Sequence, residues 1–352
     1  RPQHYIHITI CKPSPFTGIN PRYFFFTSSK PFYLIYSMTE SFFLVVLMYV
    51  LNIKAQAVLI QVEQWSTLEI VLTSNSEYDN AYTAVEVWAV FTNQHGGSLT
   101  RPAFWDGGNT WKIRFTPTDF NSVWTWKSAA SITQDEGLNG QSGQFKSIPS
   151  TSQNELLKNG LLKISSGHRN VIHHSGKPFL IVGDTPWAIP FRATTEQVDT
   201  YAKDRHLKGF NTALMMTVQP DMKAEGPNSR NTEKGFKRAF NDLSDGHINQ
   251  INVSYFQYYD KIVNILIAHE IAPVFQPIFH GYGWKGLDVL GRTVDPEEYV
   301  RYCKYLLARY GSQPAIWLLG GDHNGKDPGI LESGEMLEEW DCYNQPTGIH
   351  YN

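Results

Sequence analysis

Polar and aromatic side chains follow four apolar runs in the second half of the chain, and their types suit carbohydrate chemistry. At the ends of these runs stand Asp184 with Trp187, the long polar segment Gln219–Gln250, His280 with Trp284, and Asp322 with His323. A carboxylate can move a proton to or from a reacting oxygen, and indole rings stack on sugar faces. We therefore predict one site with a catalytic carboxylate and five substrate-binding residues, namely catalytic Asp322 and binding residues Asp184, Trp187, His280, Trp284 and His323.

Asp322 is the strongest single candidate for catalysis. It follows the apolar run Ile316–Leu319 and two glycines, which let the backbone approach a ligand without a Cβ in the way. Three of the other candidate residues could have structural roles instead. Asp184 could cap a turn before a Thr-Pro pair, and His280 and His323 could be satisfied structural histidines.

The elements that must position these residues alternate between strand and helix. Apolar runs predict strands at Pro178–Gly183, Gly209–Thr217, Ile271–Phe279, Ala315–Leu319 and Thr347–Asn352. Periodicity and capping signals predict helices at Thr195–Leu207, Val253–His269 and Asp295–Tyr310. This alternation indicates a parallel sheet. Because no Gly-x-Gly-x-x-Gly follows the first strand, we expect a (β/α)8 barrel rather than a dinucleotide-binding sheet.

Residues 178–352 are fewer than the roughly 250 of a whole barrel. They provide four βα units and the start of a fifth strand. We therefore expect a barrel truncated after four to five units, in a fragment that is incomplete and inactive. Glycoside hydrolysis uses two carboxylates across the scissile bond, and the chain offers one convincing candidate.

A β domain is expected at residues 58–148, before the barrel. Its predicted strands are Leu68–Thr73, Ala84–Thr92, Ala103–Trp105, Thr110–Phe115 and Ser122–Ser128. Asp106–Asn109 predicts a tight hairpin, and regular short strands indicate an immunoglobulin-like sandwich. Its tryptophans could stack on sugars or fill the core. We expect a hairpin or linker at Gly137–Asn154, and a linker with short strands at 149–177.

The first 57 residues are expected to lie outside the fold. Phe42–Leu51 is an apolar run followed by Ala-Gln-Ala, which predicts a signal peptide at 38–57; a buried strand or helix is the alternative. The run is too short to span a bilayer. Residues 1–37 precede Met38, and we expect them to be a non-native, disordered upstream segment. Export predicts a secreted protein, extracellular or periplasmic, without stable membrane insertion after cleavage.

Composition argues against several classes of protein. A net charge of −3 disfavours a nucleic-acid binder, and 18% charged with 14% aromatic residues disfavours disorder of the bulk of the chain. Three cysteines are too few for a disulfide scaffold, and Cys303 and Cys342 could pair or be buried thiols. We expect neither a metal, since no cluster has ligand spacing, nor a cofactor.

Several strings resemble a known enzyme family. The segments GKPFLIVGDTPW (176–187), KGFNTALMMT (208–217) and AIWLLGGDHN (315–324) resemble the apiosidase-like barrels of glycoside hydrolases. Pro102–Gly107 with Trp111, Arg114, Phe115, Pro117 and Trp124 resembles the immunoglobulin-like domain that precedes certain bacterial glycosidase barrels. The resemblance covers about residues 60–352.

The resemblance implies a secreted enzyme that hydrolyses O-glycosidic bonds of plant-type polysaccharide, such as apiose-containing pectin, with retention. The acid/base carboxylate after strand four of such barrels maps onto Asp322. The second carboxylate follows strand seven, beyond residue 352. The alternative is a non-catalytic protein that binds carbohydrate through the aromatic residues of its sandwich and barrel.

Overall fold

The structure, a computed structural model, describes residues 7–9, 59–226, 237–281, 286–322 and 324–351. The described fold belongs to one compact unit, which comprises Arg1–Thr9 and Gln61–Asn352. The expected signal peptide at 38–57 lies outside the described residues. In the segment expected to be disordered, the described part is strand β1 (His7–Thr9), which pairs in parallel with β3 (Leu68–Thr73).

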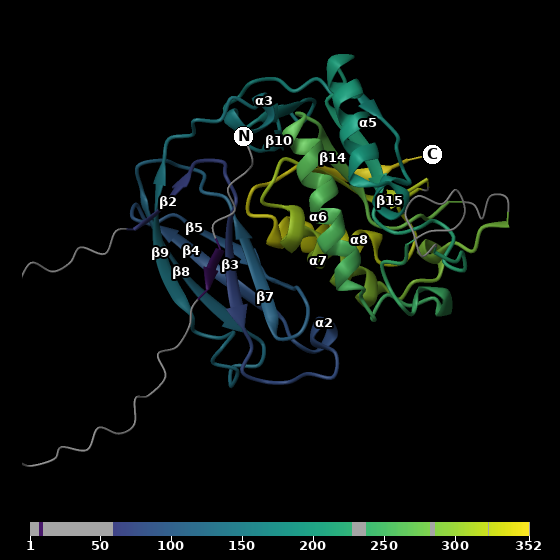
Figure 1. The fold of residues 1–352 in the computed structure, drawn as a ribbon, viewed down its shortest axis with the longest axis horizontal. Coiled ribbons are helices and arrows are strands. Elements are labelled where there is room, and N and C mark those ends of the chain that lie inside the picture. The colour runs from purple at the N-terminus through teal and green to yellow at the C-terminus, as the bar shows by residue number, and fades with distance from the viewer. Residues whose placement is uncertain (1–6, 10–58, 227–236, 282–285, 323, 352) are drawn as a thin grey trace, which may run out of the picture. The chain divides into compact units, whose positions relative to one another are not determined.

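Two β-sheets pack face to face in the N-terminal part (Figure 1). One has the order β1-β3-β7-β6, with β6 at Phe104–Trp105 and β7 at Thr110–Phe115. The other has the order β2-β9-β8-β4-β5, with β2 at Ile60–Glu63, β4 at Val87–Asn93, β5 at Ser98–Pro102, β8 at Val123–Ala130 and β9 at Ser142–Ile148. The segment Gly137–Asn154, predicted as a hairpin or linker, contains strand β9. Its alternate residues Phe145 and Ser147 are buried, and this alternation stabilises the strand.

Aromatic side chains fill the space between these sheets. Phe91 of β4 stacks on Phe115 of β7 with ring centroids 3.9 Å apart, and Trp124 of β8 lies 5.1 Å from Phe115. Trp111, Trp124 and Trp126 are at most 3% exposed. These three tryptophans are therefore part of the hydrophobic core, and their rings are not accessible for stacking on sugars.

The predicted hairpin at Asp106–Asn109 is confirmed. Strands β6 and β7 pair in antiparallel fashion, and the N–H of Asp106 donates to the carbonyl of Thr110 at 2.9 Å. Gly107 has a φ of +100° and Gly108 a φ of +53°, which is the left-handed region that glycine adopts at little cost. A short helix, α2 (Ala81–Ala84), precedes β4.

A five-stranded parallel sheet forms the C-terminal part. Its strands are β12 (Gly183–Asp184), β13 (Thr212–Met216), β14 (Ala272–Gln276), β15 (Ile316–Gly321) and β16 (Thr347–His350), in that spatial order. Because the order follows the chain without reversal, it differs from a doubly wound sheet and matches the succession of strands in a (β/α) barrel. Within the described residues the sheet is open, with β12 and β16 at its edges.

Helices connect the parallel strands, and a small hairpin of β10 (Leu162–Ile164) and β11 (Val171–His173) precedes them. The helices are α3 (Glu155–Lys158), α4 (Ile189–Arg192), α5 (Thr195–Leu207), α6 (Val253–Ala268), α7 (Pro296–Tyr310) and α8 (Ile330–Trp340), with 3-10 turns η1 (Leu243–Asp245) and η3 (Leu290–Arg292). The predicted starts of α5 and α7 are confirmed. Thr194 forms a capping box with Gln197 at the start of α5, and the side chain of Asp295 accepts from the N–H of Glu297 at the start of α7. Helix α8 was not predicted. No helix in the described ranges has the length and apolar character to cross a bilayer.

The first strand of the parallel sheet is shorter than predicted. Of Pro178–Gly183, only Gly183 belongs to β12, and the side chain of Leu180 is 79% exposed. The side chain of Asn211 bonds the carbonyl of Leu180 at 2.7 Å and the N–H of Val182 at 2.9 Å. These bonds occupy backbone groups that a longer strand would use for pairing.

A buried ion network joins the sandwich to the helices beside the parallel sheet. The two carboxylate oxygens of Asp260 on α6 each accept from Arg309 on α7 at 2.8 Å, and Arg114 on β7 donates to them at 2.7 and 3.3 Å. Arg114 also bonds Glu69 at 2.9 Å, and Arg309 bonds Asp106 at 2.8 Å. Burial alone would raise the pKa of Asp260, but the two guanidinium groups lower it to about 2.

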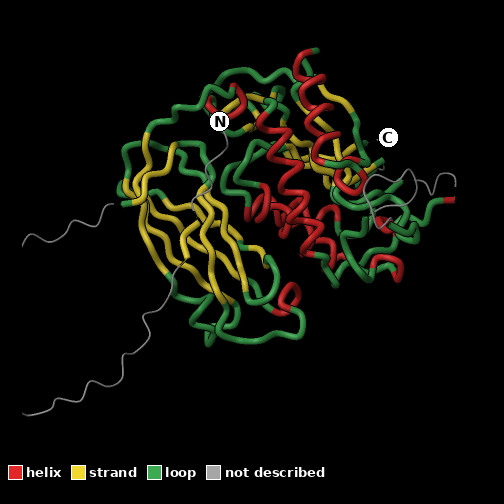
Figure 2. Tube along the Cα trace, viewed as in Figure 1, coloured by secondary structure: helices red, strands yellow, loops and turns green. Residues whose placement is uncertain are grey.

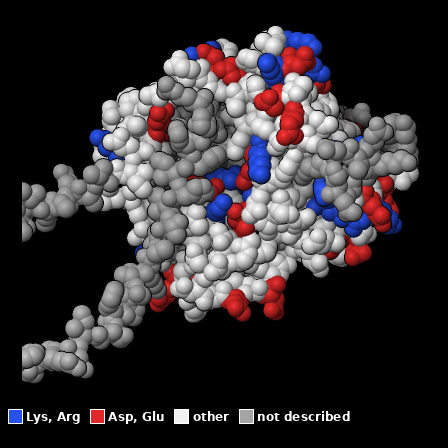
Figure 3. Space-filling model, viewed as in Figure 1, with Lys and Arg blue, Asp and Glu red and all other residues white. Residues whose placement is uncertain are grey.

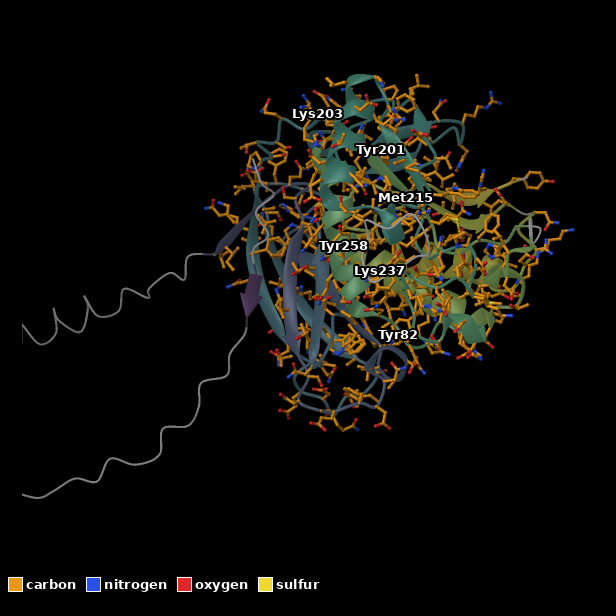
Figure 4. The ribbon with its side chains drawn as sticks, turned by 45° about the vertical axis from the view of Figure 1, so that its right-hand side comes forward. Tyr82, Tyr201, Lys203, Met215, Lys237 and Tyr258 are labelled. Atoms are coloured by element: carbon orange, nitrogen blue, oxygen red, sulfur yellow. The ribbon has the colours of Figure 1, made fainter. Side chains whose placement is uncertain are left out.

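Helix α7 also packs an aromatic side chain against the N-terminal part of the chain. Tyr82, labelled in Figure 4, meets Tyr305 of α7 edge to face with centroids 5.6 Å apart. Figure 2 shows α6 and α7 in red between two groups of yellow strands. Cys303 of α7 is a buried free thiol, and burial raises its pKa to about 12; Cys342 is also unpaired. The two cysteines therefore do not form a disulfide in this structure.

Candidate functional site

The C-terminal ends of the five parallel strands share one edge of the sheet. The residues at these ends are Asp184, Met216, Gln276, Gly321 and His350. Barrel enzymes carry their active sites at this edge. Of the predicted site residues, the fold brings Asp184, Trp187, His280 and Asp322 to these strand ends or the segments that follow them. Trp284 and His323 lie outside the described residues.

Asp322 has a backbone conformation that few non-glycine residues adopt. Its φ is +52°, in the left-handed region. The register between β15 and β16 shifts between Leu318 and Gly321, immediately before it. Bulges of this kind re-aim side chains beside active sites, and unusual backbone conformations cluster at functional sites. Both features mark the position that the sequence predicted as catalytic.

His350 stands beside Asp322 and was missed by the sequence analysis. Its Nδ1 lies 2.9 Å from Oδ1 of Asp322, and the two side chains are 37% and 20% exposed. The contact arises because Gly321 pairs with His350 in the parallel ladder. The available signal was a histidine near the end of the predicted strand Thr347–Asn352, where the preceding predicted strands also carry polar residues.

His280 is fully buried and bonded to the end of β15. Its Nδ1 accepts from the N–H of Gly321 at 3.2 Å, and its own N–H donates to the carbonyl of Gly321 at 3.1 Å. Its ring meets Tyr299 of α7 edge to face, with centroids 5.6 Å apart. These bonds tie the segment after β14 to the residue before Asp322, which favours the structural role left open for His280.

Asp184 is an ionised carboxylate with both oxygens engaged. One oxygen accepts from Nε of Arg205 at 2.6 Å, and the other accepts from the N–H of Thr185 at 2.7 Å. The hydrogen bond from Arg205 lowers the pKa of Asp184. Arg205 belongs to α5, over which acidic and basic side chains gather in Figure 3. The bond to Thr185 is the local turn contact that the capping alternative predicted.

Trp187 lies partly buried between the segments that follow β12 and β14. Its ring centroid is 5.5 Å from that of Phe279, and its carbonyl accepts from the N–H of Met216 at 3.3 Å. Its indole Nε1 is buried and has no hydrogen-bond partner among the residues that the structure describes. An indole donor without a partner at this edge is available to a hydroxyl group.

Thr217 holds the ends of β13 and β14 together. Its N–H donates to the carbonyl of Gln276 at 2.9 Å, and its hydroxyl donates to the carbonyl of Pro277 at 2.8 Å. Tyr255 of α6 donates to the carbonyl of Thr217 at 2.7 Å, and the hydroxyl of Tyr302 on α7 contacts the threonine hydroxyl. The sequence analysis did not predict these contacts of Tyr255 and Tyr302 with Thr217. The only sign of them in the sequence is that tyrosine, and not phenylalanine, stands at these helix positions.

The described parts of the long polar segment Gln219–Gln250 are fixed to two neighbours. The N–H of Met222 donates to the carbonyl of Asp288 at 2.9 Å, in the segment after β14. His247 contacts Glu298 of α7 at 2.9 Å through Nδ1. The segment therefore spans from the strand edge to the start of α7. In the described part of the chain, no group of three or more His, Cys, Asp or Glu residues could hold a metal ion.

Family models match two parts of the chain. Residues 165–352 match the apiosidase-like catalytic domain, and residues 61–131 match a domain of unknown function, DUF5060. No relative was found among curated proteins.

The chain is similar to solved structures of other proteins. A Bacteroides vulgatus protein assigned as a glycoside hydrolase is 21% identical with a TM-score of 0.65, over 83% of this chain and 56% of that one. A family 5 glycoside hydrolase of the same organism is 23% identical with a TM-score of 0.44, over 56% of this chain and 40% of that one. The chain thus spans little more than half the length of the first structure. Since the apiosidase-like model matches more than half of its residues, the chain belongs to the family of apiosidase-like catalytic domains.

Proposed function

We propose that the protein containing this chain is a secreted glycoside hydrolase that acts on plant-type polysaccharide. The observation that carries this proposal is the position of Asp322. Its carboxylate follows a barrel-type strand, has a left-handed backbone conformation and lies 2.9 Å from a histidine. Membership of the apiosidase-like family supports the reaction class.

In the proposed mechanism, Asp322 gives a proton to the leaving glycosidic oxygen and then takes one from water. The Nδ1 of His350 lies 2.9 Å from the carboxyl group and is proposed to hold it as an ion-pair partner when the imidazole is protonated. Asp184 and Trp187 bind the sugar from the end of β12 on the same sheet edge, and Trp284 and His323 belong to the same proposed set. For His280 we propose that it fixes the turn before Asp322, since its ring faces Gly321.

The second carboxylate of the reaction is not assigned to a described residue. Asp184 is the other strand-end carboxylate at this edge, but its pKa is lowered and its oxygens are bonded to Arg205 and Thr185. We propose retention of configuration, which requires a second carboxylate about 5–5.5 Å from the first. The anomer released, followed by NMR, tests this point, and an inverted product contradicts it.

Apiose-containing pectin is the proposed substrate. The test is to incubate the natural-length protein with such pectin and to measure released apiose by chromatography. Release by the wild type and none by a heat-inactivated sample supports the proposal. If no sugar is released from this or any other plant polysaccharide tested, the proposed activity is wrong.

Secretion is proposed from the apolar run and Ala-Gln-Ala sequence at 38–57. N-terminal sequencing of the protein recovered from the culture medium tests it, and the expected first residue is Val58. A mature protein that begins upstream of Met38 contradicts the proposal.

A further inference from the structure

Gln276 is a buried residue whose side-chain amide is unsatisfied. It ends β14, none of its surface is exposed, and within the described ranges neither Oε1 nor Nε2 has a hydrogen-bond partner. Gln345, also buried, provides a contrast. Its Oε1 accepts from the N–H of Ala315 at 2.7 Å, and its Nε2 donates to the carbonyl of Gly311 at 2.7 Å.

The side chain of Gln276 lies on the face of the sheet that is turned away from α7. The preceding residue, Phe275, stacks on Tyr310 of α7 with centroids 5.1 Å apart. Because successive side chains of a strand alternate between faces, Gln276 lies on the other face. There it reaches Gly321, where a Cβ would lie 1.7 Å from Nε2. The amide is therefore next to the residue that precedes Asp322.

An unbonded amide in the interior destabilises a folded protein, and such groups in native proteins commonly have a catalytic or binding role or bond an ordered water. A primary amide offers two donors and an acceptor, which match adjacent sugar hydroxyls. A second unpartnered donor, Nε1 of Trp187, belongs to the same edge, because the N–H of Met216 bonds the carbonyl of Trp187 and Met216 pairs with Gln276. Two unpaired groups on the same sheet edge as Asp322 favour a ligand with several hydroxyls over a structural water.

We infer that Gln276 binds a pair of adjacent hydroxyl groups of the sugar whose glycosidic bond Asp322 acts on. The inference rests on the proposed function. The amide fills the space that the missing Cβ of Gly321 leaves, so it lies directly against the backbone that carries Asp322. Gln276 is then a specificity residue, because a sugar that lacks either hydroxyl leaves part of the amide unpaired.

The variant Gln276→Leu tests the inference, since leucine is apolar and of similar size. We expect its Tm to rise by about 2–4 °C, because an unpaired amide is removed. Its affinity for free apiose, measured by ligand-observed NMR titration of the full chain, should fall at least about tenfold. Gln345→Leu is the matched control. It leaves the bonded groups of Ala315 and Gly311 unpaired, so its Tm should fall while its apiose affinity stays unchanged.

Unchanged apiose affinity in Gln276→Leu overturns the inference, whatever happens to its Tm. A loss of affinity with a fall in Tm as large as that of Gln345→Leu also overturns it, because the amide then has a structural partner. If the wild type binds none of apiose, galacturonate and arabinose, the proposed function and the sugar assignment are contradicted together. The Tm of Gln276→Leu then still decides whether the amide is unpaired in the protein.

Discussion

Oδ1 of Asp322 and Nδ1 of His350 lie 2.9 Å apart at the ends of neighbouring parallel strands. The parallel register pairs Gly321 with His350, which brings the histidine beside the next residue, Asp322, and the ladder is irregular between Leu318 and Gly321. A histidine in this position can orient the carboxyl group and exchange a proton with it. The two residues should therefore act as a unit, and the first two predictions follow from this.

Asp322→Asn should lower kcat of the natural-length protein by about 10²–10⁴-fold, the range of general acid–base catalysis, because the amide cannot carry the transferred proton. Its Tm and sugar binding should stay close to those of the wild type. Asp79→Asn, at an exposed position of the sandwich, is the control and should keep full activity. An Asp322→Asn protein that turns over at the wild-type rate removes this residue from the mechanism.

His350→Gln should reduce kcat by about tenfold in the wild-type background and by less than about twofold in the Asp322→Asn background. The reason is that residues in direct contact show non-additive effects, whereas independent residues add. Kinetics of the two single variants and the double variant complete the cycle. Equal reductions in both backgrounds would show that His350 acts independently of Asp322.

Asp260→Asn should lower the free energy of unfolding by about 3–5 kcal/mol, because Arg114 and Arg309 would keep buried charges without their shared carboxylate. Urea unfolding at neutral pH measures the loss. Asp199→Asn is the control, since Asp199 is 61% exposed and its contact with His269 is at the surface. A loss no larger than that of the control would mean that the network contributes little.

The same carboxylate gives a pH dependence. Its pKa is about 2 in the folded protein and 3.8 as the ordinary value, so the unfolded state binds the proton first as the pH falls. The contribution of Asp260 is complete above about pH 4 and is lost as the pH drops toward 2, which amounts to about 2 kcal/mol. Wild-type stability should fall more steeply than that of Asp260→Asn between pH 4 and 2, and parallel curves would contradict this.

His247 should titrate above the ordinary histidine range because its hydrogen bond to Glu298 raises its pKa. A raised pKa means that the contact stabilises the fold below pH 6.5 and that this contribution disappears as the pH rises through the folded-state value. NMR titration of the imidazole signals measures the pKa directly. In Glu298→Gln the pKa should move down toward 6.5, and an unchanged titration would assign the shift to another group.

Gly321→Ala should lower the free energy of unfolding by about 1–3 kcal/mol, because the new Cβ would meet the buried amide of Gln276. In a Gln276→Ala background the same substitution should cost much less, since the amide is gone. Gly334→Ala, on α8, is the control, because a Cβ there meets nothing within 4 Å. Equal costs of Gly321→Ala in the two backgrounds would show that the strain comes from elsewhere.

Local patterns in the sequence were enough to predict the bounds of those strands and helices that depend mainly on their own residues. The strands Leu68–Thr73 and Thr110–Phe115 and the helix Thr195–Leu207 have the predicted bounds. Alternation and the capping box act over a few residues, so they can be recognised without a partner. The place of Asp322 at a strand end follows in the same way, because an apolar run and two glycines precede it.

Tertiary contacts decided what lies beside these elements. Asp260 meets Arg114, which is 146 residues away in the chain, and Gln276 reaches Gly321 of the next strand. His350 became a neighbour of Asp322 through the parallel register, and Asn211 shortened the first strand of the parallel sheet by bonding Leu180. No local pattern records such pairs, since their energies depend on which distant groups the fold buries together. The sequence by itself therefore determined the candidate carboxylate, and the packing of the sheet determined the groups that surround it.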